Sequence, residues 1–286
     1  MKKLAIMSDL HIDLNAFGEW EISTLIQTLQ EKKVTHLHLS GDISNHHKSI
    51  SEPFLETLRQ HFTVTYNLGN HDMLDLTEKE IEEQDFQIHQ IGNRQLLAFH
   101  GWYDYSFVGE DEKTILKRKQ LWFDRRIDRP LSDPEMCQTI LKRLEEELQK
   151  LDTDRLILAM HFVPHQHFTM WHEKFAPFNA FLGSQAFHQL FVNYGVQDVV
   201  FGHAHRSFRT VVLDKVRYHS RPLGYIREWD LTITFVQDHP ELNPTGTWNL
   251  SKRYNLVKTN PHYQAHKKEK FKTELLNSMS LFECDK

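Results

Sequence analysis

The alternation of short apolar runs with amphipathic segments in the first third of the sequence constrains the fold more than any other feature. Residues 3–8, 34–39 and 62–68 have the length and the apolar or β-branched composition of short buried strands. Between them, residues 18–33 carry apolar side chains at helical spacing, and residues 51–60 have the length of a short helix. This βαβαβ order predicts a parallel sheet covered by helices, with a ligand site at the carboxyl ends of the strands.

Strand and helix patterns continue beyond this region. Within residues 73–154, the sequence predicts helices over 77–84, 113–126 and 134–151 and strands over 86–91 and 95–99. The second half predicts, in chain order, a strand over 156–160, a helix over 184–193, a strand over 198–201, a β-rich stretch over 207–236 and a final helix within 260–281. No repeat or long linker divides the chain, so we expect a single domain.

The composition indicates a soluble protein that binds neither membrane nor nucleic acid. The 34 lysine and arginine residues against 39 aspartate and glutamate residues give a net charge of −5, which does not favour an anionic polymer or lipid as partner. No apolar run reaches the ~18–20 residues that span a bilayer, and the N-terminal run ends at Ser8, too early for a signal peptide. Cys137 and Cys284 lie far apart and form no disulfide framework. We therefore expect a cytoplasmic location.

Side chains of the types that bind metal ions follow several of the predicted strands. In chain order, these clusters are Asp9-Leu10-His11, Gly41-Asp42, Gly69-Asn70-His71-Asp72, His161 and Gly202-His203-Ala204-His205. Residues i and i+2 of an extended segment point to one side, so Asp9 and His11 can share one metal ion, and the imidazoles of His203 and His205 form another same-side pair. The 20 histidines of the chain also favour a metal site. We expect the clusters to converge at one edge of the sheet.

Taken in order, these clusters resemble the motifs of the calcineurin-like metallophosphoesterase family. The similarity extends from about Lys3 to His205 and includes each expected ligand. It implies an α/β fold in four layers, α/β/β/α, with two sheets between outer helices. It further implies a single metallophosphoesterase domain over residues 1–286, in which residues 73–154, between the third and fourth motifs, form a partly helical insertion or cap.

The same resemblance implies a site for two metal ions and assigns their ligands. Asp9, His11 and His205 would bind one ion, Asn70, His161 and His203 the other, and Asp42 would bridge the two. Carboxylate, imidazole and amide ligands together suit manganese, iron or zinc better than magnesium or calcium. Two such divalent or trivalent ions imply a hydrolase that cleaves a phosphodiester or a small phosphomonoester by attack of a metal-bridging hydroxide.

The third cluster also supplies the residues expected to act on the substrate. His71 directly follows the ligand Asn70 and is expected to face the phosphate rather than a metal ion. Its imidazole would either protonate the leaving oxygen or stabilise the developing charge. Asp72 is expected to orient His71; the alternative is that Asp72 caps a helix.

Two further groups are candidates for contact with the substrate. Trp102 and Tyr103 follow a predicted strand and would form a wall of the cleft, although core packing explains such residues equally well. His165 and His167 come soon after His161 and would line the cleft, with exposed loop histidines as the alternative.

Two classes of function are compatible with this sequence. The first is the phosphoesterase, within which a nuclease and a phosphoprotein phosphatase use the same ligands. The second is a non-catalytic scaffold of the same fold that binds a protein partner. Such scaffolds typically lack metal ligands or the histidine after the asparagine, whereas this chain has Asp42, Asn70 and His71. The enzyme is therefore favoured; the sequence gives no indication of the oligomeric state.

Overall fold

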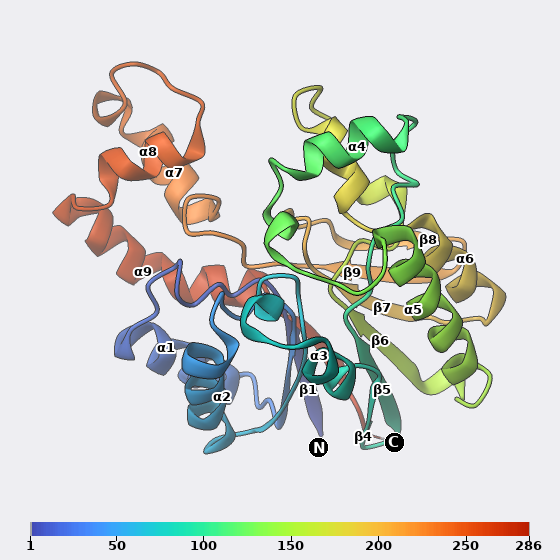
Figure 1. Ribbon diagram of the computed structural model, residues 1–286. Coiled ribbons are helices and arrows are strands. Elements are labelled where there is room, and N and C mark those ends of the chain that lie inside the picture. Colours follow the sequence, from blue (N-terminus) through green and yellow to red (C-terminus); the bar gives the residue numbers. More distant parts are fainter. Residues whose placement is uncertain (1, 286) are drawn as a thin grey trace.

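Two β-sheets packed face to face form the centre of the molecule, and helices cover their outer faces (Figure 1). The computed structural model describes residues 2–285. One sheet has the strand order β10-β1-β2-β3 and the other the order β4-β5-β6-β7-β9-β8. This arrangement is the four-layer α/β/β/α sandwich that the sequence predicts.

The first sheet is built mainly from the βαβαβ segment at the start of the chain. Its strands are β1 (Lys3–Met7), β2 (His36–Ser40), β3 (Thr63–Asn67) and β10 (Ser280–Glu283). The first three run parallel, and β10 pairs antiparallel with β1. Helices α1 (Glu19–Glu31) and α2 (Glu52–Arg59) cover its outer face (Figure 1). Leu25 and Leu29 of α1, one helical turn apart, are both fully buried, as the predicted amphipathic spacing requires.

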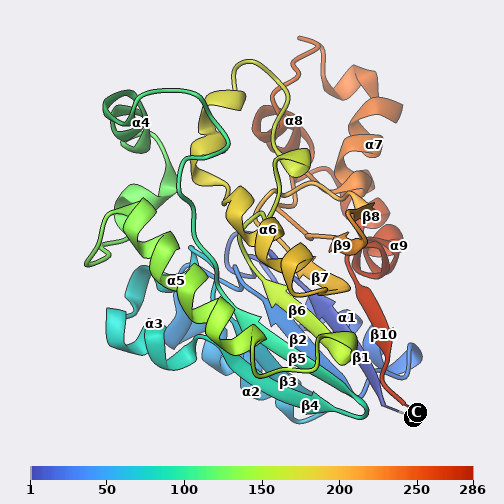
Figure 2. The ribbon, with the colours of Figure 1, turned by 90° about the vertical axis from the view of Figure 1, so that its right-hand side faces the viewer.

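The second sheet collects strands from the middle of the chain. Its strands are β4 (Gln87–Ile91), β5 (Arg94–Phe99), β6 (Leu156–Met160), β7 (Asp198–Phe201), β8 (Arg209–Leu213) and β9 (Val216–Ser220). The four inner strands run parallel, and the edge strands β4 and β8 are antiparallel to their neighbours. Helices α5 (Asp133–Leu148) and α6 (Gln185–Asn193) cover the outer face of this sheet (Figure 2).

Residues 73–154 contribute both to this sheet and to the helices above it. They supply β4 and β5, the helices α3 (Glu78–Gln84), α4 (Glu112–Lys119) and α5, and the short 3-10 helix η3 (Phe123–Arg126). The single helix predicted over 113–126 is therefore wrong in its second half. The chain turns after Lys119 because Trp122 stacks on Phe178 and Phe181, with ring centroids 5.4 and 5.8 Å apart.

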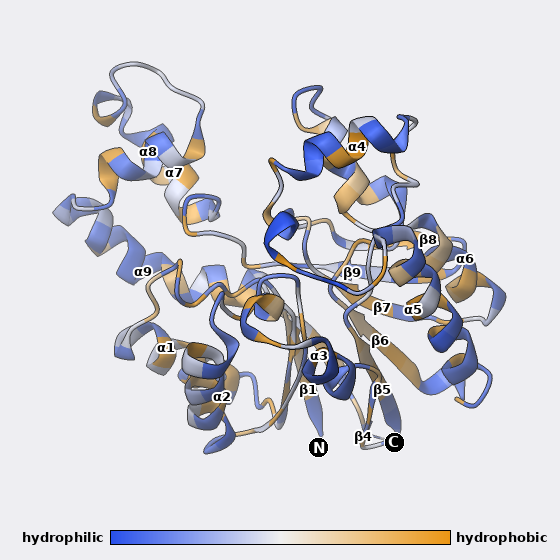
Figure 3. Ribbon diagram, in the orientation of Figure 1, coloured by the Kyte–Doolittle hydropathy of each residue, from blue (hydrophilic) through white to orange (hydrophobic). Residues whose placement is uncertain are grey.

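Apolar side chains from the inner faces of both sheets form the core between them. They are Leu4, Ile6, Ile91, Leu96, Ala98, Ile157, Ala159, Val200 and Cys284, and each is at most 3% exposed. Figure 3 shows the same separation, with hydrophobic residues along the central strands and hydrophilic residues on outer helices such as α9 (Pro261–Asn277). None of the helices within residues 2–285 is long and apolar enough to cross a membrane.

The C-terminal third differs most from its sequence-based prediction. The stretch 207–236 contains the predicted hairpin, β8 and β9, but it ends in the helix α7 (Asp230–Asp238) rather than in a strand. Ile233, Phe235 and Val236 of α7 are β-branched or aromatic, yet Leu231 and Phe235 lie one helical turn apart and are both buried, as in a helix. Helix α8 (Leu250–Val257) and the strand β10 were not predicted, and the predicted final helix is α9.

Strand β2 places a row of polar side chains between the two sheets. His36 Nε2 and His38 Nδ1 contact Thr65 Oγ1 at 2.8 and 2.9 Å, and His38 Nε2 donates to Asn67 Oδ1 at 2.9 Å. Ser40 Oγ donates to a backbone carbonyl of β6 at 2.9 Å. His38 is fully buried, so these bonds satisfy polar groups that would otherwise destabilise the fold.

Acidification is expected to destabilise the protein through His38. Burial lowers the pKa of its imidazole to about 3 from an ordinary 6.5. As the pH falls below the ordinary value, the unfolded chain takes up a proton at His38 while the folded protein does not, so stability is lost, by ~1.4 kcal/mol at about pH 5.5. Urea unfolding at about pH 7.5 and 5.5 should show a loss of stability that is smaller by about this amount in His38→Gln than in the wild type. Equal pH dependence of the two proteins would contradict the assignment.

Candidate metal centre

The predicted metal-binding side chains converge at the carboxyl ends of strands from both sheets. Asp9 and His11 follow β1, Asp42 follows β2, Asn70 follows β3, His161 follows β6, and His203 and His205 follow β7. His205 is partly exposed and the others are buried. Residues distant in sequence therefore meet in one place because parallel strands of the two packed sheets end at the same edge.

Four of these residues form the first candidate metal site. The ligand atoms of Asp9, His11, Asp42 and His205 all lie within 4.8 Å of one another. His11 Nε2 lies 3.0 Å from His205 Nε2 and 3.6 Å from Asp42 Oδ2. His205 Nε2 lies 3.2 Å from Asp9 Oδ1. Two imidazole nitrogens and two carboxylates thus face a common point.

A second group shares Asp42 with the first. The ligand atoms of Asp42, His161 and His203 lie within 4.8 Å of one another. His161 Nε2 is 3.4 Å from Asp42 Oδ1 and 3.1 Å from Asn70 Oδ1, which places the Asn70 amide oxygen at this second site. The two oxygens of the Asp42 carboxylate therefore face different groups.

The side chains present fit two metal ions. Asp42 Oδ2 is buried without a hydrogen-bond partner among the described residues, a costly arrangement for a carboxylate unless a cation is bound. The mixture of imidazole, carboxylate and amide donors suits manganese, iron or zinc. The donor set and the unpartnered oxygen are those expected of a site that binds a cation, and the presence of two ions stays a prediction.

The backbone of several candidate ligands has an unusual, left-handed conformation, which is also typical of functional sites. Asp9, His11, Asp42, His203 and His205 have φ angles of 57°, 41°, 56°, 64° and 48°. Non-glycine residues in this left-handed region cost ~1–3 kcal/mol each and concentrate at functional sites. Glycines allow the loops to approach the carboxylates, since a Cβ at Gly69 would lie 2.2 Å from Asp42 Oδ1 and one at Gly202 2.3 Å from Asp9 Oδ2. The glycines of the sequence clusters therefore have a direct steric role.

The protonation of three ligands already suits metal binding. Burial alone would raise the pKa of the Asp42 carboxyl, but the protonated imidazole of His161 outweighs this effect and holds the pKa well below its ordinary value. Burial also lowers the pKa of His11 well below its ordinary value and that of His203 to about 3. Asp42 is therefore ionised and the two imidazoles neutral, as ligands must be.

His161 and His205 behave differently because carboxylates surround them. Burial lowers their pKa values, but Asp42 raises that of His161 to about 9, and Glu228 with Asp9 raises that of His205 to about 10. In the metal-free protein both rings therefore carry a proton at neutral pH. Metal binding must displace these protons, so metal affinity should fall as the pH decreases.

His71 lies beside the shared carboxylate without joining either metal-ligand group. Its Nε2 is 3.9 Å from Asp42 Oδ2, and its backbone N–H donates to Asp42 Oδ1 at 2.9 Å. Nδ1 donates to Asn45 Oδ1 at 2.7 Å, and the ring stacks on Phe123 with centroids 3.6 Å apart. Burial lowers the pKa of His71 to about 4. One face and one nitrogen of the ring are thus fixed, and Nε2 is directed toward the centre.

Asp72 does not orient His71, and this part of the sequence interpretation is corrected. Its carboxylate accepts backbone N–H groups of Asp42, Gly69, Ile43 and Ser44 at 2.7 to 3.1 Å. The alternative of a helix cap is also not formed, because Asp72 is the first residue of a 3-10 turn whose cap is His71. Asp72 instead ties the loop after β2 to the loop after β3, because its carboxylate accepts N–H groups from both loops.

Sequence reasoning missed several residues around the ligands. Glu228 Oε2 contacts His205 Nδ1 at 2.9 Å, an arrangement that fixes the orientation of a metal-binding histidine. Tyr225 Oη lies 3.4 Å from His71 Nε2. Asn70 Nδ2 donates to Asp124 Oδ1 at 2.7 Å, which turns Asn70 Oδ1 toward His161. These partners come from η3 and from the loop before α7, where no local pattern marks them.

Removal of Asp124 is expected to weaken metal binding. The side chain is fully buried, and it holds the Asn70 amide with its oxygen toward the second site. Loss of such an outer hydrogen-bond partner typically lowers metal affinity by ~10–100-fold. Titration calorimetry of the metal-stripped Asp124→Ala variant with Mn²⁺ would measure this, with Asp128→Ala, an exposed neighbour, as control. Unchanged affinity would show that Asn70 needs no support from Asp124.

Of the four residues expected to contact the substrate, two lie in the core and two lie outside the metal-ligand groups. Trp102 and Tyr103 are 1% and 0% exposed and stack on each other in the core, with Trp102 Nε1 donating to Asp133 Oδ1 at 3.0 Å. They form no cleft wall, which agrees with the alternative of core packing. His165 is partly buried against His188, with ring centroids 4.4 Å apart, and His167 is exposed. Neither histidine belongs to a metal-ligand group among the described residues.

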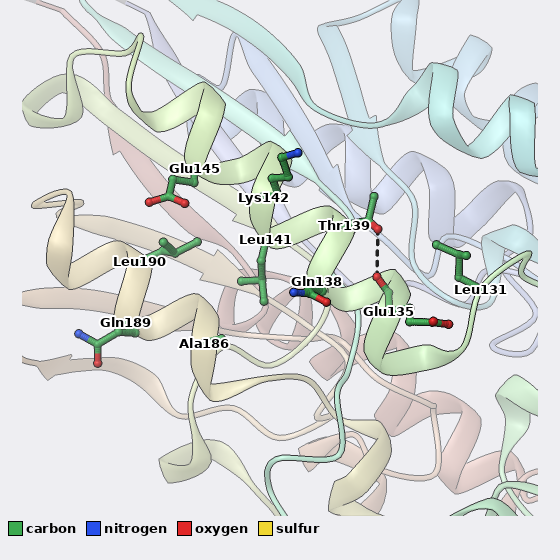
Figure 4. Close-up of a pocket in the computed structure, with 10 residues that line it drawn as sticks. All are labelled: Leu131, Glu135, Gln138, Thr139, Leu141, Lys142, Glu145, Ala186, Gln189 and Leu190. Atoms are coloured by element: carbon green, nitrogen blue, oxygen red, sulfur yellow. Dashed lines mark hydrogen bonds between the residues drawn. The ribbon is translucent and has the colours of Figure 1, made fainter.

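One large cavity lies away from the metal centre. It has a volume of 730 Å³ and lies between α5 and α6, where Leu141 and Leu190 form its apolar wall (Figure 4). None of the predicted ligands lines it. A second cavity of 560 Å³ adjoins the metal centre and is lined by His205 and Glu228. The chemistry of the side chains, rather than cavity size, identifies the second as the one relevant to the metal centre.

Comparison with known proteins agrees with this geometry. A family model described as calcineurin-like phosphoesterase matches residues 2–207. Phosphopantetheinyl hydrolase from Mycobacterium tuberculosis has a similar fold, with a TM-score of 0.62 and 19% identity over 80% of this chain and 91% of that one. A dimetal phosphatase from Danio rerio aligns with a TM-score of 0.49 and 14% identity over 77% and 87% of the two chains. A search of curated proteins gives no significant match.

Proposed function

Because the chain belongs to the calcineurin-like phosphoesterase family, we propose that it hydrolyses a phosphodiester or a small phosphomonoester with the help of two metal ions. The observation that carries this proposal is the Asp42 carboxylate, which belongs to both groups of potential ligands. A shared carboxylate suits two ions ~3.5–4 Å apart. The proposed ligands are those assigned from the sequence, with Asp9, His11 and His205 at the first site and Asn70, His161 and His203 at the second.

The ions and the protein supply different parts of the chemistry. When bound, the two ions would act as Lewis acids toward the phosphoryl group and lower the pKa of a water molecule. The protein fixes the ligands: Glu228 holds His205, Asp124 holds Asn70, and Asp72 holds the loops that carry Asp42 and Asn70. Catalysis of this kind depends on ligands that are held in place before the substrate binds, by hydrogen bonds from the residues behind them.

His71 is the proposed proton donor to the leaving oxygen. Its Nδ1–H is held by Asn45 and its ring by Phe123, so that Nε2 faces the centre. Burial keeps the ring neutral in the free protein, and an anionic phosphate ester beside Nε2 would raise this pKa. His71 would therefore take up its proton with the substrate and release it to the leaving group.

The first experiment compares metal-stripped protein with protein reloaded with Mn²⁺. Hydrolysis of bis-p-nitrophenyl phosphate and of p-nitrophenyl phosphate is measured for the wild type, for Asn70→Ala and for the exposed control Asn193→Ala. We expect Mn²⁺ to restore activity in the wild type and in the control but not in Asn70→Ala. The ratio of the two rates would identify the preferred ester class. Activity that is indifferent to metal would contradict the proposal.

The finer assignments remain predictions. Manganese, iron and zinc are the expected ions, and a cytoplasmic location is expected from the composition. A non-catalytic scaffold is the rival function, and the presence of His71 together with both ligand groups speaks against it. A nuclease or a phosphoprotein phosphatase would use the same centre, and neither is favoured by a particular observation.

A further inference from the structure

The cavity beside His205 is lined by three arginines. Arg206 directly follows the last ligand cluster, Arg209 begins β8, and Arg221 comes directly after β9. Arg206 and Arg209 are exposed and Arg221 is partly buried. The hairpin β8–β9 pairs Arg209 with Ser220, which brings Arg209 and Arg221 to the same end of the hairpin. The cavity therefore combines a proposed metal ligand with a concentrated positive charge.

These three guanidinium groups lack the acidic partners that most other arginines have. Arg94, Arg129 and Arg217 each contact a carboxylate at 2.7 to 2.8 Å. Among residues 2–285, no carboxylate lies within 4.0 Å of the guanidinium nitrogens of Arg206, Arg209 or Arg221. Arg221 has only a long contact of 3.5 Å to the carbonyl of Asn277, and Arg206 lies over the Phe208 ring.

The acidic residues of the same cavity are mostly engaged elsewhere. Glu228 Oε2 contacts His205 and accepts the backbone N–H of Tyr225. The Glu274 carboxylate accepts the two backbone N–H groups at the start of α7. Asp230 is exposed and is the one carboxylate of the cavity without such a contact among the described residues. Burial lowers the pKa of Arg221, and the positive charge of Arg209 lowers it further.

We propose that this cavity, lined by Arg206, Arg209 and Arg221, binds a second phosphate group of the substrate while the scissile phosphate lies at the metal centre. The inference rests on the proposed phosphoesterase function and names its substrate class, a phosphate ester that carries another phosphate. Guanidinium groups are suited to this task because their planar N–H donors match phosphate oxygens and remain charged at all working pH values. Unpaired arginines next to a catalytic centre also raise the local concentration of an anionic substrate.

A matched pair of substrates isolates the second phosphate. Thymidine 5′-(p-nitrophenyl phosphate) and its 3′-phosphate derivative contain the same scissile ester and differ in one phosphate group. With the Mn²⁺-loaded wild type, we expect the 3′-phosphate to lower KM by about tenfold, the effect of one good charged contact. In Arg209→Ala and in Arg209→Ala/Arg221→Ala, this KM ratio should fall toward one. Arg253→Ala is the control, since Arg253 also has no carboxylate partner and contacts the carbonyl of Thr247 instead.

A binding measurement on metal-stripped protein separates the two proposals. Inorganic pyrophosphate should bind the wild type and Arg253→Ala, and it should bind Arg209→Ala several-fold more weakly. Arg209 is exposed, so its replacement does not endanger the fold. Weakened binding without turnover of either ester would support the anion site and contradict the phosphoesterase. Equal KM values for the two esters, or pyrophosphate binding unchanged in Arg209→Ala, would overturn the anion site.

Discussion

Replacement of Asp42 by alanine is expected to abolish both metal binding and hydrolysis. The carboxylate is shared by the two ligand groups, and its pKa, well below the ordinary value, keeps it ionised. The loss of metal affinity should exceed the ~10–100-fold that removal of an outer partner causes. The fold should survive, because Asp42→Ala removes one bond between the two loops, that from the His71 N–H, while the four bonds to Asp72 remain.

Three measurements test this expectation. Bound metal is counted in Asp42→Ala after reloading with Mn²⁺, hydrolysis of bis-p-nitrophenyl phosphate is followed, and thermal unfolding reports on the fold. Asp238→Ala, an exposed residue at the end of α7, is the matched control. If Asp42→Ala kept one tightly bound ion, Asp42 would belong to a single site; if it kept full activity, the assignment of two ions would be wrong.

The variant His71→Ala should retain both metal ions and lose ~10²–10⁴ in turnover, the range for a positioned general acid. His71 lies outside both ligand groups, so metal binding does not depend on it. A good leaving group needs little protonation, so the loss should be smaller for p-nitrophenyl phosphate than for phenyl phosphate. Comparison of kcat for the two esters in the wild type, His71→Ala and the exposed control His61→Ala measures this difference.

The pattern of the losses distinguishes the possible roles of His71. Equal losses for both leaving groups would replace proton transfer with stabilisation of charge by the imidazole. Loss of bound metal in His71→Ala would make His71 a ligand instead. Neither result would contradict the proposed phosphoesterase activity, because the Asp42→Ala variant tests that activity separately.

Most of the fold could be predicted where local pattern and tertiary environment agree. The βαβαβ segment could be predicted because β1 and β2 are almost entirely buried and each connecting helix has one apolar face. Helix α7 was mistaken for β structure because its β-branched and aromatic residues favour strands locally. Tertiary contacts decide otherwise, since Glu274 of α9 accepts the N–H groups at the first turn of α7.

The candidate site divides in the same way. Its candidate ligands follow directly after strands, so their position in the sequence predicts that they meet at one edge of the sheets. Asp124 and Glu228 are different, because each meets its partner only through the tertiary fold; Asp124 lies 54 residues from Asn70. Asp72 could be identified but not its function, since its four backbone donors come from two loops whose approach no sequence pattern reveals.

The pairing of β10 with β1 has a consequence for synthesis of the protein. Lys3 pairs with Glu283, so the strand that leads into Asp9 acquires one of its two neighbours only after nearly all the intervening chain has been made. Until then β1 is an edge strand, whose open N–H and C=O groups can pair with other chains. Contacts this distant in sequence also form slowly. Folding on the ribosome is therefore expected to leave the metal centre unfinished until translation has passed β10, the period in which a chaperone would protect this edge.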